Sequence, residues 1–396
     1  MTMNAGLLRS SVIVVIEAYL QHGMLSRSDL AALTGISRSA ITEITQNLLD
    51  MGLLEEFPVL QEKQGRGRPA ISLRFKASHG YFIGVSVTDI PSLVILADMQ
   101  GNVVGECEIP PSDAPRKIGA TIRRTMNDLL RRTGVPRSRL LSIGIAVTGV
   151  VDENNGVCRY SAALNWRDVP IAELVKKATG VEAYVGNDAN AVAIGEKLFG
   201  RARDLKHFSS LILGRNIGCA HYIEGNLYRG YDGGAGEIGH VTVDINGPRC
   251  PCGKNGCLDM FAGSTAMLGS AKTAGLDCQT MRDLEELANV GNAKAMTILR
   301  NGAQALGLAV ASIIQINNPQ CILFADLEGF GRGIFQSTTR QVIENNILPR
   351  FLASTEIVFH QVDKSFLARA AASVAAQQYL RTGIASRING NALQKS

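Results

Sequence analysis

The amino-acid sequence predicts an α/β protein with an N-terminal winged helix-turn-helix followed by a larger body of two related lobes. Three observations lead to this prediction. They are apolar residues at helical spacing in the first 54 residues, a glycine-rich basic segment at 63–76, and apolar strands combined with helices from about residue 80. At 396 residues the chain is long enough for two or three folded units. We expect a helix-turn-helix domain at 1–62, a basic arm or linker at 63–79 and the two-lobed body at 80–396.

Composition and charge describe an ordinary folded protein. Hydrophobic residues make up 46% of the chain, charged residues 19%, and the net charge is only +5. The charge of the whole chain therefore does not indicate a polyanionic partner, and any basic surface must be local. The N-terminal apolar run at 12–16 stops at Glu17, and no segment approaches the ~18 uninterrupted apolar residues of a membrane span. We expect a cytoplasmic protein without membrane insertion, whose eight cysteines stay reduced.

The segment 28–54 has the pattern of two short helices separated by a glycine. Ser28 can cap the first helix, Gly35 supplies the turn, and Ser37 can cap the second helix. The buried stripe of the second helix is expected to consist of Ala40, Ile41, Ile44, Leu48 and Met51. This arrangement is typical of a DNA-binding helix-turn-helix, and a small helical packing domain is the alternative.

In a helix-turn-helix, the first turns of the second helix reach the base edges of DNA. Here that part of the helix would present Arg38, Ser39 and Thr42 outward. The segment 63–76 that follows has the pattern of a wing, with Arg66 and Arg68 between glycines. Arginines on a thin, flexible arm suit the narrow minor groove, whereas a solvated linker is the other interpretation.

From about residue 80 the pattern changes to strands and helices. Hairpin strands are followed by a helix and a parallel strand, and the same order begins again near residue 208. The expected strands are 81–87, 93–98, 102–109, 141–149, 208–214, 219–225 and 321–326, with a helix at 117–132 that carries an Arg/Lys face. This repetition predicts two related lobes around a cleft.

One loop gathers His240, Cys250, Cys252 and Cys257, with the cysteines spaced as C-x-C-x4-C. In a reducing compartment a disulfide is not expected, so a metal site and unliganded thiols remain as alternatives. The other cysteines stand singly in apolar surroundings and are expected to be small core residues. They are Cys107, Cys158, Cys219, Cys278 and Cys321.

Several motifs resemble those of the ROK family, which groups bacterial sugar kinases with transcriptional repressors. The most specific are GEIGH at 236–240 and CPCGKNGC at 250–257, supported by the segments 187–196 and 306–323. The resemblance implies that the body has a two-lobed, actin-like (ribonuclease H-like) ATPase-type fold. A helix-turn-helix followed by a GRGRP arm is similar to the repressor branch of the family.

With this resemblance, the Cys3His set is interpreted as a zinc site in the loop 240–257. One imidazole and three thiolates close a tetrahedral shell, which leaves no position for water. Gly253 and Gly256 would let the backbone fold round the ion. We therefore expect one structural Zn²⁺ per chain.

The resemblance also implies the position of a kinase base, Asp188, but the elements that bind nucleotide in the family are altered. Ser86 stands where the family kinases have a metal-linked aspartate, and Asp326 stands where they have a Gly-Gly pair near adenine. The second phosphate loop, 214–220, carries bulky residues where backbone should approach phosphate. We expect neither ATP binding nor kinase activity, with no catalytic residue and Asp188 as a vestigial base.

By the same resemblance, the hexose contacts of the family fall on Asn187, Asp188, Glu237, His240 and Asp259. Asp259 is one methylene shorter than the glutamate that the family has there. Trp166, the single tryptophan, either stacks on a sugar or fills the core.

We therefore expect a DNA-binding transcriptional regulator, a repressor of carbohydrate-metabolism genes that responds to a sugar or sugar derivative. Its partners would be operator DNA, the effector, and further copies of itself in a homodimer or homotetramer. Two alternatives stay open: an ATP-dependent sugar kinase with an accessory DNA-binding domain, and a repressor controlled by a protein partner.

Overall fold

The computed structural model describes residues 5–58, 71–87, 92–110 and 114–383. The chain forms two compact units, and the first is built from both ends of the sequence. Unit 1 comprises Met1–Asp204 and Leu367–Ser396, and unit 2 comprises Leu205–Phe366. Unit 1 therefore holds the DNA-binding domain together with the first lobe, and unit 2 is the second lobe.

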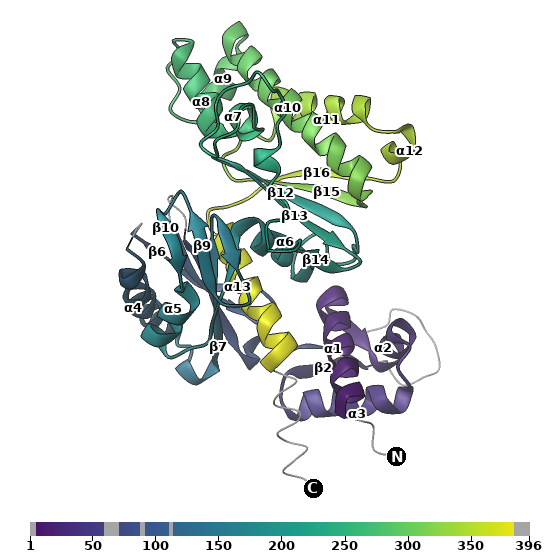
Figure 1. Ribbon diagram of the computed structural model, residues 1–396. Helices are drawn as coiled ribbons and strands as arrows, with labels where there is room; N and C mark the ends of the chain where they lie inside the picture. Colours follow the sequence, from purple (N-terminus) through teal and green to yellow (C-terminus); the bar gives the residue numbers. More distant parts are fainter. Residues whose placement is uncertain (1–4, 59–70, 88–91, 111–113, 384–396) are drawn as a thin grey trace. The chain divides into compact units, whose positions relative to one another are not determined.

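The N-terminal domain is a winged helix-turn-helix (Figure 1, purple). Three helices pack beside a three-stranded antiparallel sheet with the strand order β1-β3-β2. Its elements are α1 (Ala5–His22), β1 (Met24–Ser26), α2 (Arg27–Thr34), α3 (Arg38–Asp50), β2 (Leu54–Pro58) and β3 (Ile71–Phe75). The predicted arm or linker at 63–79 is too long, because residues 71–75 form the central strand of this sheet.

The helix caps agree with the prediction at α3 but not at α2. Ser37 caps α3 by accepting a 3.4 Å hydrogen bond from the Ala40 amide, and Gly35 ends α2 with a φ of 68°. The predicted cap at Ser28 is wrong, because α2 begins directly after β1. Ser26 caps it instead, accepting from the Asp29 amide at 3.2 Å while its own amide donates to the Asp29 carboxylate at 3.1 Å.

The buried face of α3 contains the predicted Ile41, Ile44 and Leu48. Ala40 and Met51 are only half-buried. Thr45 is also fully buried, and its hydroxyl accepts a 3.0 Å hydrogen bond from Arg27 Nε of α2. This polar contact lets a threonine occupy a core position between the two helices.

The first lobe is a five-stranded sheet in the order β11-β7-β4-β5-β6. Strands β4, β7 and β11 are parallel, and β5 and β6 continue from β4 as an antiparallel meander. The strands are β4 (Tyr81–Val87), β5 (Ser92–Asp98), β6 (Val103–Ile109), β7 (Leu140–Val147) and β11 (Ala183–Asn187). A small sheet of β8 (Val150–Asp152), β9 (Val157–Ser161) and β10 (Trp166–Val169) follows β7 in the chain.

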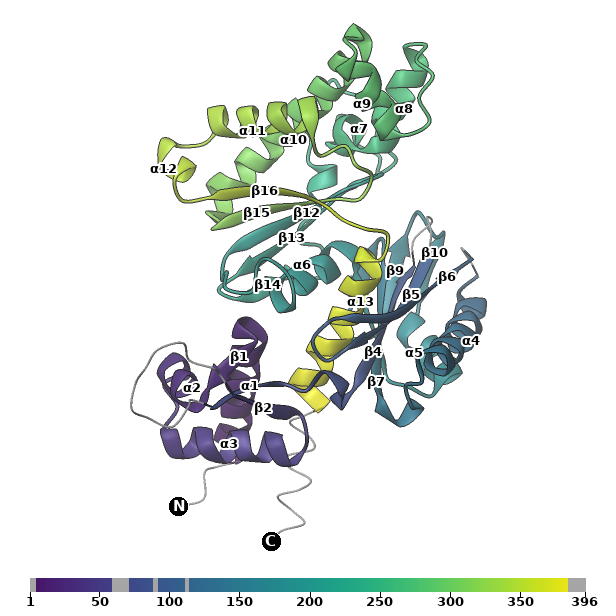
Figure 2. The same cartoon turned by 180° about the vertical axis from the view of Figure 1, so that it is seen from behind.

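Helices cover both faces of this sheet (Figure 2). Helices α4 (Pro115–Thr133) and α5 (Ile171–Thr179) lie on one face, and α13 (Phe366–Gln378) crosses the other. Gly84 and Gly144 bring the backbone of α13 against the sheet: a Cβ at either glycine would overlap a carbonyl oxygen of α13, that of Ala368 or of Ala371. Helix α6 (Asp188–Leu198) follows β11 directly.

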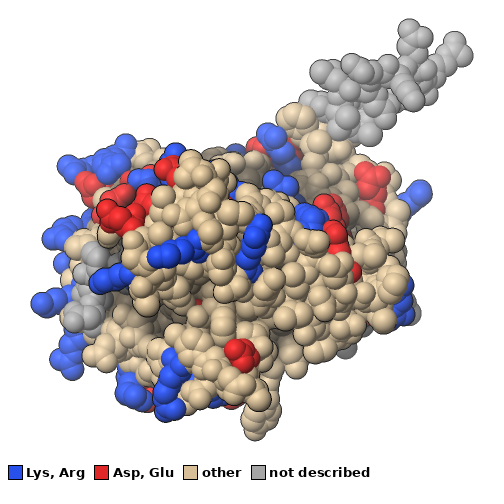
Figure 3. Space-filling view, turned by 90° about the horizontal axis from the view of Figure 1, so that it is seen from above, with Lys and Arg blue, Asp and Glu red and all other residues tan. Residues whose placement is uncertain are grey.

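The outer surface of α4 is strongly basic, as the sequence predicted. Its exposed cations are Arg116, Lys117, Arg123, Arg124, Arg131 and Arg132, and Asp128 is the one acidic residue of the helix. Lys and Arg side chains gather along the left edge of the view in Figure 3, on the side where Figure 1 places α4. Asp128 pairs with Arg131 at 2.5 Å and with Arg132 at 3.5 Å.

The second lobe repeats the topology of the first. Its sheet has the order β14-β13-β12-β15-β16, with β12, β15 and β16 parallel and β13 and β14 as the antiparallel meander. The strands are β12 (Phe208–Leu213), β13 (Ile217–Ile223), β14 (Asn226–Tyr228), β15 (Cys321–Asp326) and β16 (Glu356–Gln361). The same order and the same strand directions in both sheets confirm the predicted pair of related lobes.

Helices of the second lobe are α7 (Asp259–Ala262), α8 (Ser264–Thr273), α9 (Met281–Asn289), α10 (Ala293–Asn317), α11 (Gly333–Asn346) and α12 (Pro349–Leu352). Among the described residues, α10 is the single helix long and apolar enough to cross a membrane. Its most apolar stretch is 61% buried within the fold, and Leu299, Leu306, Val310 and Ile314 are fully enclosed. Its composition is therefore explained by its place as the core helix of unit 2.

Candidate functional site

The predicted DNA-reading residues lie on the exposed face of α3. Arg38, Ser39 and Thr42 are all exposed in its first turns, opposite the buried Ile41 and Ile44. The Thr42 hydroxyl donates to the Arg38 carbonyl at 2.8 Å, so its oxygen can still accept a hydrogen bond. The predicted outward orientation is confirmed, while contact with DNA stays a prediction. Arg66 and Arg68 lie outside the described residues.

Two other arginines of this domain form ion pairs with glutamates. Arg74 contacts Glu55 at 2.8 Å and Arg27 contacts Glu56 at 3.9 Å. Arg38 forms no ion pair with any described residue of the chain. A guanidinium that pairs with none of the described residues, at the start of the second helix, is suited to contact the edge of a base.

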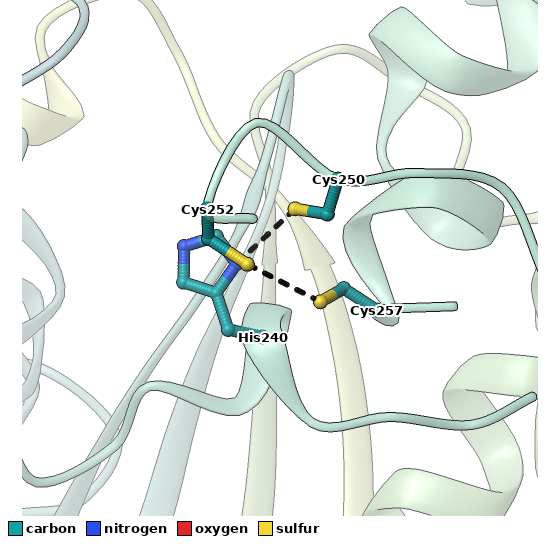
Figure 4. Close-up of side chains that lie close together, drawn as sticks. All are labelled: His240, Cys250, Cys252 and Cys257. Atoms are coloured by element: carbon teal, nitrogen blue, oxygen red, sulfur yellow. Dashed lines mark hydrogen bonds between the residues drawn. The ribbon is translucent and has the colours of Figure 1, made fainter. Parts of the chain in front are cut away.

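The four predicted metal ligands converge on a common point (Figure 4). One ligand atom from each of His240, Cys250, Cys252 and Cys257 lies within 4.8 Å of all the others. His240 Nδ1 is 3.6 Å from Cys250 Sγ, and the sulfurs of Cys252 and Cys257 are also 3.6 Å apart. A tetrahedral zinc site with its usual bond lengths has ligand separations of roughly 3.5–3.8 Å. The spacing therefore fits a metal ion and is too long for a disulfide, whose sulfurs would be about 2.05 Å apart.

The backbone of the loop explains why the ligands converge. The Cys250 amide donates to the Lys254 carbonyl at 2.8 Å, which forms a tight turn around Cys252. Both predicted glycines have positive φ, 99° at Gly253 and 65° at Gly256. A Cβ at Gly256 would overlap the carbonyl oxygen of Asp244, so a larger residue does not fit there.

The thiols are held in contrasting surroundings. Burial, followed by the neighbouring thiols, raises the pKa of Cys257 to about 12. The Lys254 amide lowers the pKa of the exposed Cys252. A divalent cation would displace the thiol protons and turn this set into strong ligands. The donor chemistry and the geometry thus both fit a closed, four-ligand metal site.

In unit 1, the predicted effector residues lie where β11 ends and α6 begins. Asn187 caps α6 by accepting from the Asn190 amide at 3.2 Å, and its Nδ2 donates to the Gly149 carbonyl at 2.9 Å. Asp188 Oδ2 accepts a 2.7 Å hydrogen bond from the Thr148 hydroxyl. This position, at the carboxyl end of a parallel strand, is where ligands commonly bind in α/β sheets.

In unit 2, the predicted effector residues have different surroundings. Glu237 is exposed, whereas His240 belongs to the metal cluster. Asp259 is 7% exposed, and both its oxygens accept hydrogen bonds from the loop after β12: from Asn216 Nδ2 at 2.7 Å and from the Ile217 amide at 2.8 Å. Because Asp259 follows Cys257 almost directly, the metal loop is physically tied to the 214–217 loop.

The positions that bind nucleotide in the family kinases are used internally here. Ser86 is 2% exposed and its hydroxyl accepts from the Leu93 amide at 3.1 Å. Asp326 is 1% exposed, and its carboxylate accepts from the amides of Gly329 at 2.7 Å and Gly331 at 2.9 Å. The Asp326 carboxylate thus stabilises a turn of the protein itself, and its charge is enclosed.

Trp166 is 1% exposed and belongs to the core of the first lobe, which favours the core interpretation over stacking on a sugar. Thr148 and Asn216 were not anticipated as partners of Asp188 and Asp259. No pattern along the chain marks either residue, since each partner lies about 40 residues away.

Comparison with known proteins agrees with this arrangement. The sequence profile of the ROK family matches residues 83–362. The chain is 27% identical to the xylose repressor of Bacillus spizizenii, over 93% of this chain and 95% of that protein. It is 25% identical to the DNA-binding transcriptional dual regulator NagC of Escherichia coli, over 87% of this chain and 86% of that protein.

Solved structures show the same fold. A ROK family transcriptional regulator that is a homologue of the E. coli MLC protein superposes with a TM-score of 0.80 at 24% identity, covering 95% of this chain and 98% of its own. A ROK hexokinase from Thermus thermophilus gives a TM-score of 0.63 at 22% identity, covering 74% of this chain and 97% of its own. The family profile spans most of the chain, and its lobes and motifs agree: the chain belongs to the ROK family.

Proposed function

We propose that this protein is a transcriptional repressor of sugar-metabolism genes, whose affinity for operator DNA is changed by a bound sugar or sugar derivative. The observation that carries the proposal is the union, in one chain, of a winged helix-turn-helix with exposed Arg38, Ser39 and Thr42 and a ROK body. Relatives that match along most of the chain are named xylose repressor and N-acetylglucosamine repressor. A pentose or an amino sugar is therefore the proposed class of effector.

On DNA, we assign base reading to α3 and the minor groove to the arm that carries Arg66 and Arg68. A helix-turn-helix repressor normally reads two half-sites as a dimer, so we propose a homodimer or a homotetramer. Sugar phosphorylation is not part of this function. Asp326 is enclosed and accepts hydrogen bonds from the protein's own backbone, and the Ile217 amide donates to Asp259, so neither group is free to bind a nucleotide.

The metal we propose is zinc, one ion per chain, held by His240, Cys250, Cys252 and Cys257. Four protein ligands leave no position for water or substrate, so the ion would have a structural role. Its effect on function would pass through Asp259, which holds Asn216 and Ile217.

The effector is proposed to bind through Asn187 and Asp188 of unit 1. The Thr148 hydroxyl fixes one oxygen of Asp188, and the remaining lone pairs can accept hydrogen bonds from sugar hydroxyls. For unit 2, the family resemblance implies Glu237, His240 and Asp259 as effector residues.

The direct test is to select duplexes from a random DNA pool with the full-length protein, and to repeat binding with xylose and with N-acetylglucosamine. We expect a palindromic site whose affinity changes with one of the two sugars. Selection of no DNA, or sugar-dependent turnover of ATP, would contradict the proposed function. A sequence-specific repressor that responds to neither sugar but co-purifies with a protein would favour control by a protein partner.

Arg38→Ala is expected to relax sequence preference at one base pair of each half-site, at a cost of about 1–3 kcal/mol if the contact is bidentate. Arg131→Ala on α4 removes the same charge far from α3 and should leave the preference unchanged. Binding matrices measured on single-base variants of the selected duplex would distinguish the two. Equal effects of both substitutions would show that Arg38 contributes charge only.

Asp188→Asn is expected to weaken effector binding by roughly 10- to 100-fold, since a hydrogen bond to a charged group contributes about 1.5–3 kcal/mol. The substitution keeps the shape of the side chain, so binding to the selected duplex without sugar should persist. The shift of melting temperature by sugar measures the change. Glu173→Ala, an exposed carboxylate on α5, is the matched control. An unaltered sugar shift in Asp188→Asn would place the effector elsewhere.

A further inference from the structure

We infer that helix α6 transmits effector binding to the DNA-binding domain, and that Phe199 at its end is the positioning residue for that domain. The inference rests on the proposed function, because the effector residues Asn187 and Asp188 stand at the start of α6. Every contact that carries it lies within unit 1.

Helix α6 is built to move as one body. Asn187 is its N-cap and Asp188 its first residue, so a ligand bound there contacts the helix end directly. The helix is enclosed on most sides, with buried residues Ala189, Asn190, Ala191, Val192, Ala193, Ile194, Glu196 and Leu198. Eleven residues span about 16 Å. A close-packed helix of this length shifts as a unit rather than bending, so displacement at one end reaches the other.

The far end of α6 contacts the turn that supports the wing. Phe199 packs its ring on Gly101, where a Cβ would come within 2.7 Å of the ring. The same turn holds the base of the wing: Gln100 Nε2 donates to the Phe75 carbonyl at 2.8 Å, and the Met99 amide donates to the Ala77 carbonyl at 3.2 Å. The ring of Phe199 is therefore linked to β3 through the turn at residues 99–101.

From the wing base the contacts continue to the recognition helix. His79, two residues after Ala77, contacts the Gly52 carbonyl through Nδ1 at 2.9 Å. Gly52 lies directly after the end of α3, whose C-cap is Met51. An unbroken series of packed groups thus joins Asp188 to the helix that carries Arg38.

A second contact from the same end of α6 reaches α1. Lys197 Nζ donates to the Arg203 carbonyl at 2.6 Å, and Arg203 Nε donates to the Leu198 carbonyl at 3.1 Å. These bonds fix the loop that places Asp204 3.6 Å from His22, at the end of α1. An exposed contact between a histidine and a carboxylate contributes little stability. This contact matters for position and not for stability. The DNA-binding domain contacts the end of α6 at two points, the base of the wing and the end of α1, so a shift of α6 would tilt the domain.

Tilting the domain would change operator affinity in a dimer. Two recognition helices must match half-sites one helical turn or a multiple of a turn apart. An effector that binds one position of α6 better than the other would shift the population between matched and mismatched spacings. The coupling is reciprocal, so DNA binding must also act on α6.

The test uses Phe199→Ala and Phe199→Leu in the full chain. In the wild type we expect xylose or N-acetylglucosamine to change affinity for the selected duplex by about 5- to 150-fold. In Phe199→Ala we expect this change to fall to within about twofold, with sugar-induced melting shift and sugar-free DNA binding retained. Phe199→Leu refills the space over Gly101 and should restore most of the response. Tyr160→Ala, which removes a partly exposed ring elsewhere in unit 1, is the control.

A second measurement does not depend on the identity of the effector. Adding the selected duplex should alter hydrogen exchange of amides at 195–199 and 99–101 in the wild type and in Tyr160→Ala, but not in Phe199→Ala. A full sugar response in Phe199→Ala, or exchange at 195–199 unchanged by DNA in the wild type, would overturn the inference. A wild type that selects no duplex would instead overturn the proposed function, so the two failures are distinguishable.

Discussion

Cys257→Ser is expected to lower the metal content of the purified protein from one zinc per chain to near zero. A serine hydroxyl is a poor zinc ligand, and Cys257 is the fully buried member of the set. Because metal bound to the folded state stabilises it, we expect unit 2 to lose at least about 3 kcal/mol. For a unit of this size the melting temperature should fall by roughly 6–12 °C. Elemental analysis and thermal unfolding measure the two effects.

Cys278→Ser is the matched control, since Cys278 is a nearly buried thiol of the same unit that does not belong to the cluster. It should keep its metal and lose little stability. A chelator should bring the wild type to the melting temperature of Cys257→Ser and should leave the variant unchanged. A Cys257→Ser protein that retains one zinc per chain, or a metal-free wild type of undiminished stability, would contradict the assignment.

The metal site shows which features a sequence reveals well. Three of its ligands lie within eight residues, and Gly253 and Gly256 mark the turns between them, so ligand identity and loop shape are both local. Seven of the ten described strands in the two large sheets were also predicted, because continuous apolar runs of strand-like length are local signals, whereas β11, β14 and β16 were not predicted. The order of the strands within each sheet is not a local feature and was not predicted; the repeated pattern along the chain predicted only that the two lobes are related.

Short elements and contacts between distant segments could not be predicted from the sequence. Strand β1 has three residues, too few for a periodic pattern, and its presence moved the cap of α2 from Ser28 to Ser26. In retrospect, Asp29 three residues after Ser26 completes a capping box that could have signalled the correct start. The packing of Phe199 on Gly101 joins residues almost 100 positions apart, and neither residue type indicates it.

Gly144→Ala is expected to destabilise unit 1 strongly. The new Cβ would overlap the carbonyl oxygen of Ala371 and approach the Ala375 amide nitrogen at 3.0 Å. Both are backbone atoms of α13, so no side chain can rotate away and the whole helix must shift. Overpacking of this kind costs about 1–3 kcal/mol and occasionally more. Thermal unfolding should show a fall of roughly 2–12 °C, and limited proteolysis should cut more readily near α13.

Gly195→Ala is the control, because Gly195 also faces α13. Its Cβ would meet Ser373 Oγ at 3.4 Å and Ala370 Cα at 3.5 Å, which is ordinary van der Waals contact. Because Gly195 lies inside α6, alanine there should add up to about 1 kcal/mol of helix propensity. Both glycines face α13, yet alanine should lower the free energy of unfolding at Gly144 and raise it at Gly195. If Gly144→Ala melted at or above the temperature of Gly195→Ala, α13 would not be packed against β7 at backbone distance. Since α13 also packs against α6 at Gly195, its displacement by Gly144→Ala should weaken the response of DNA binding to sugar as well.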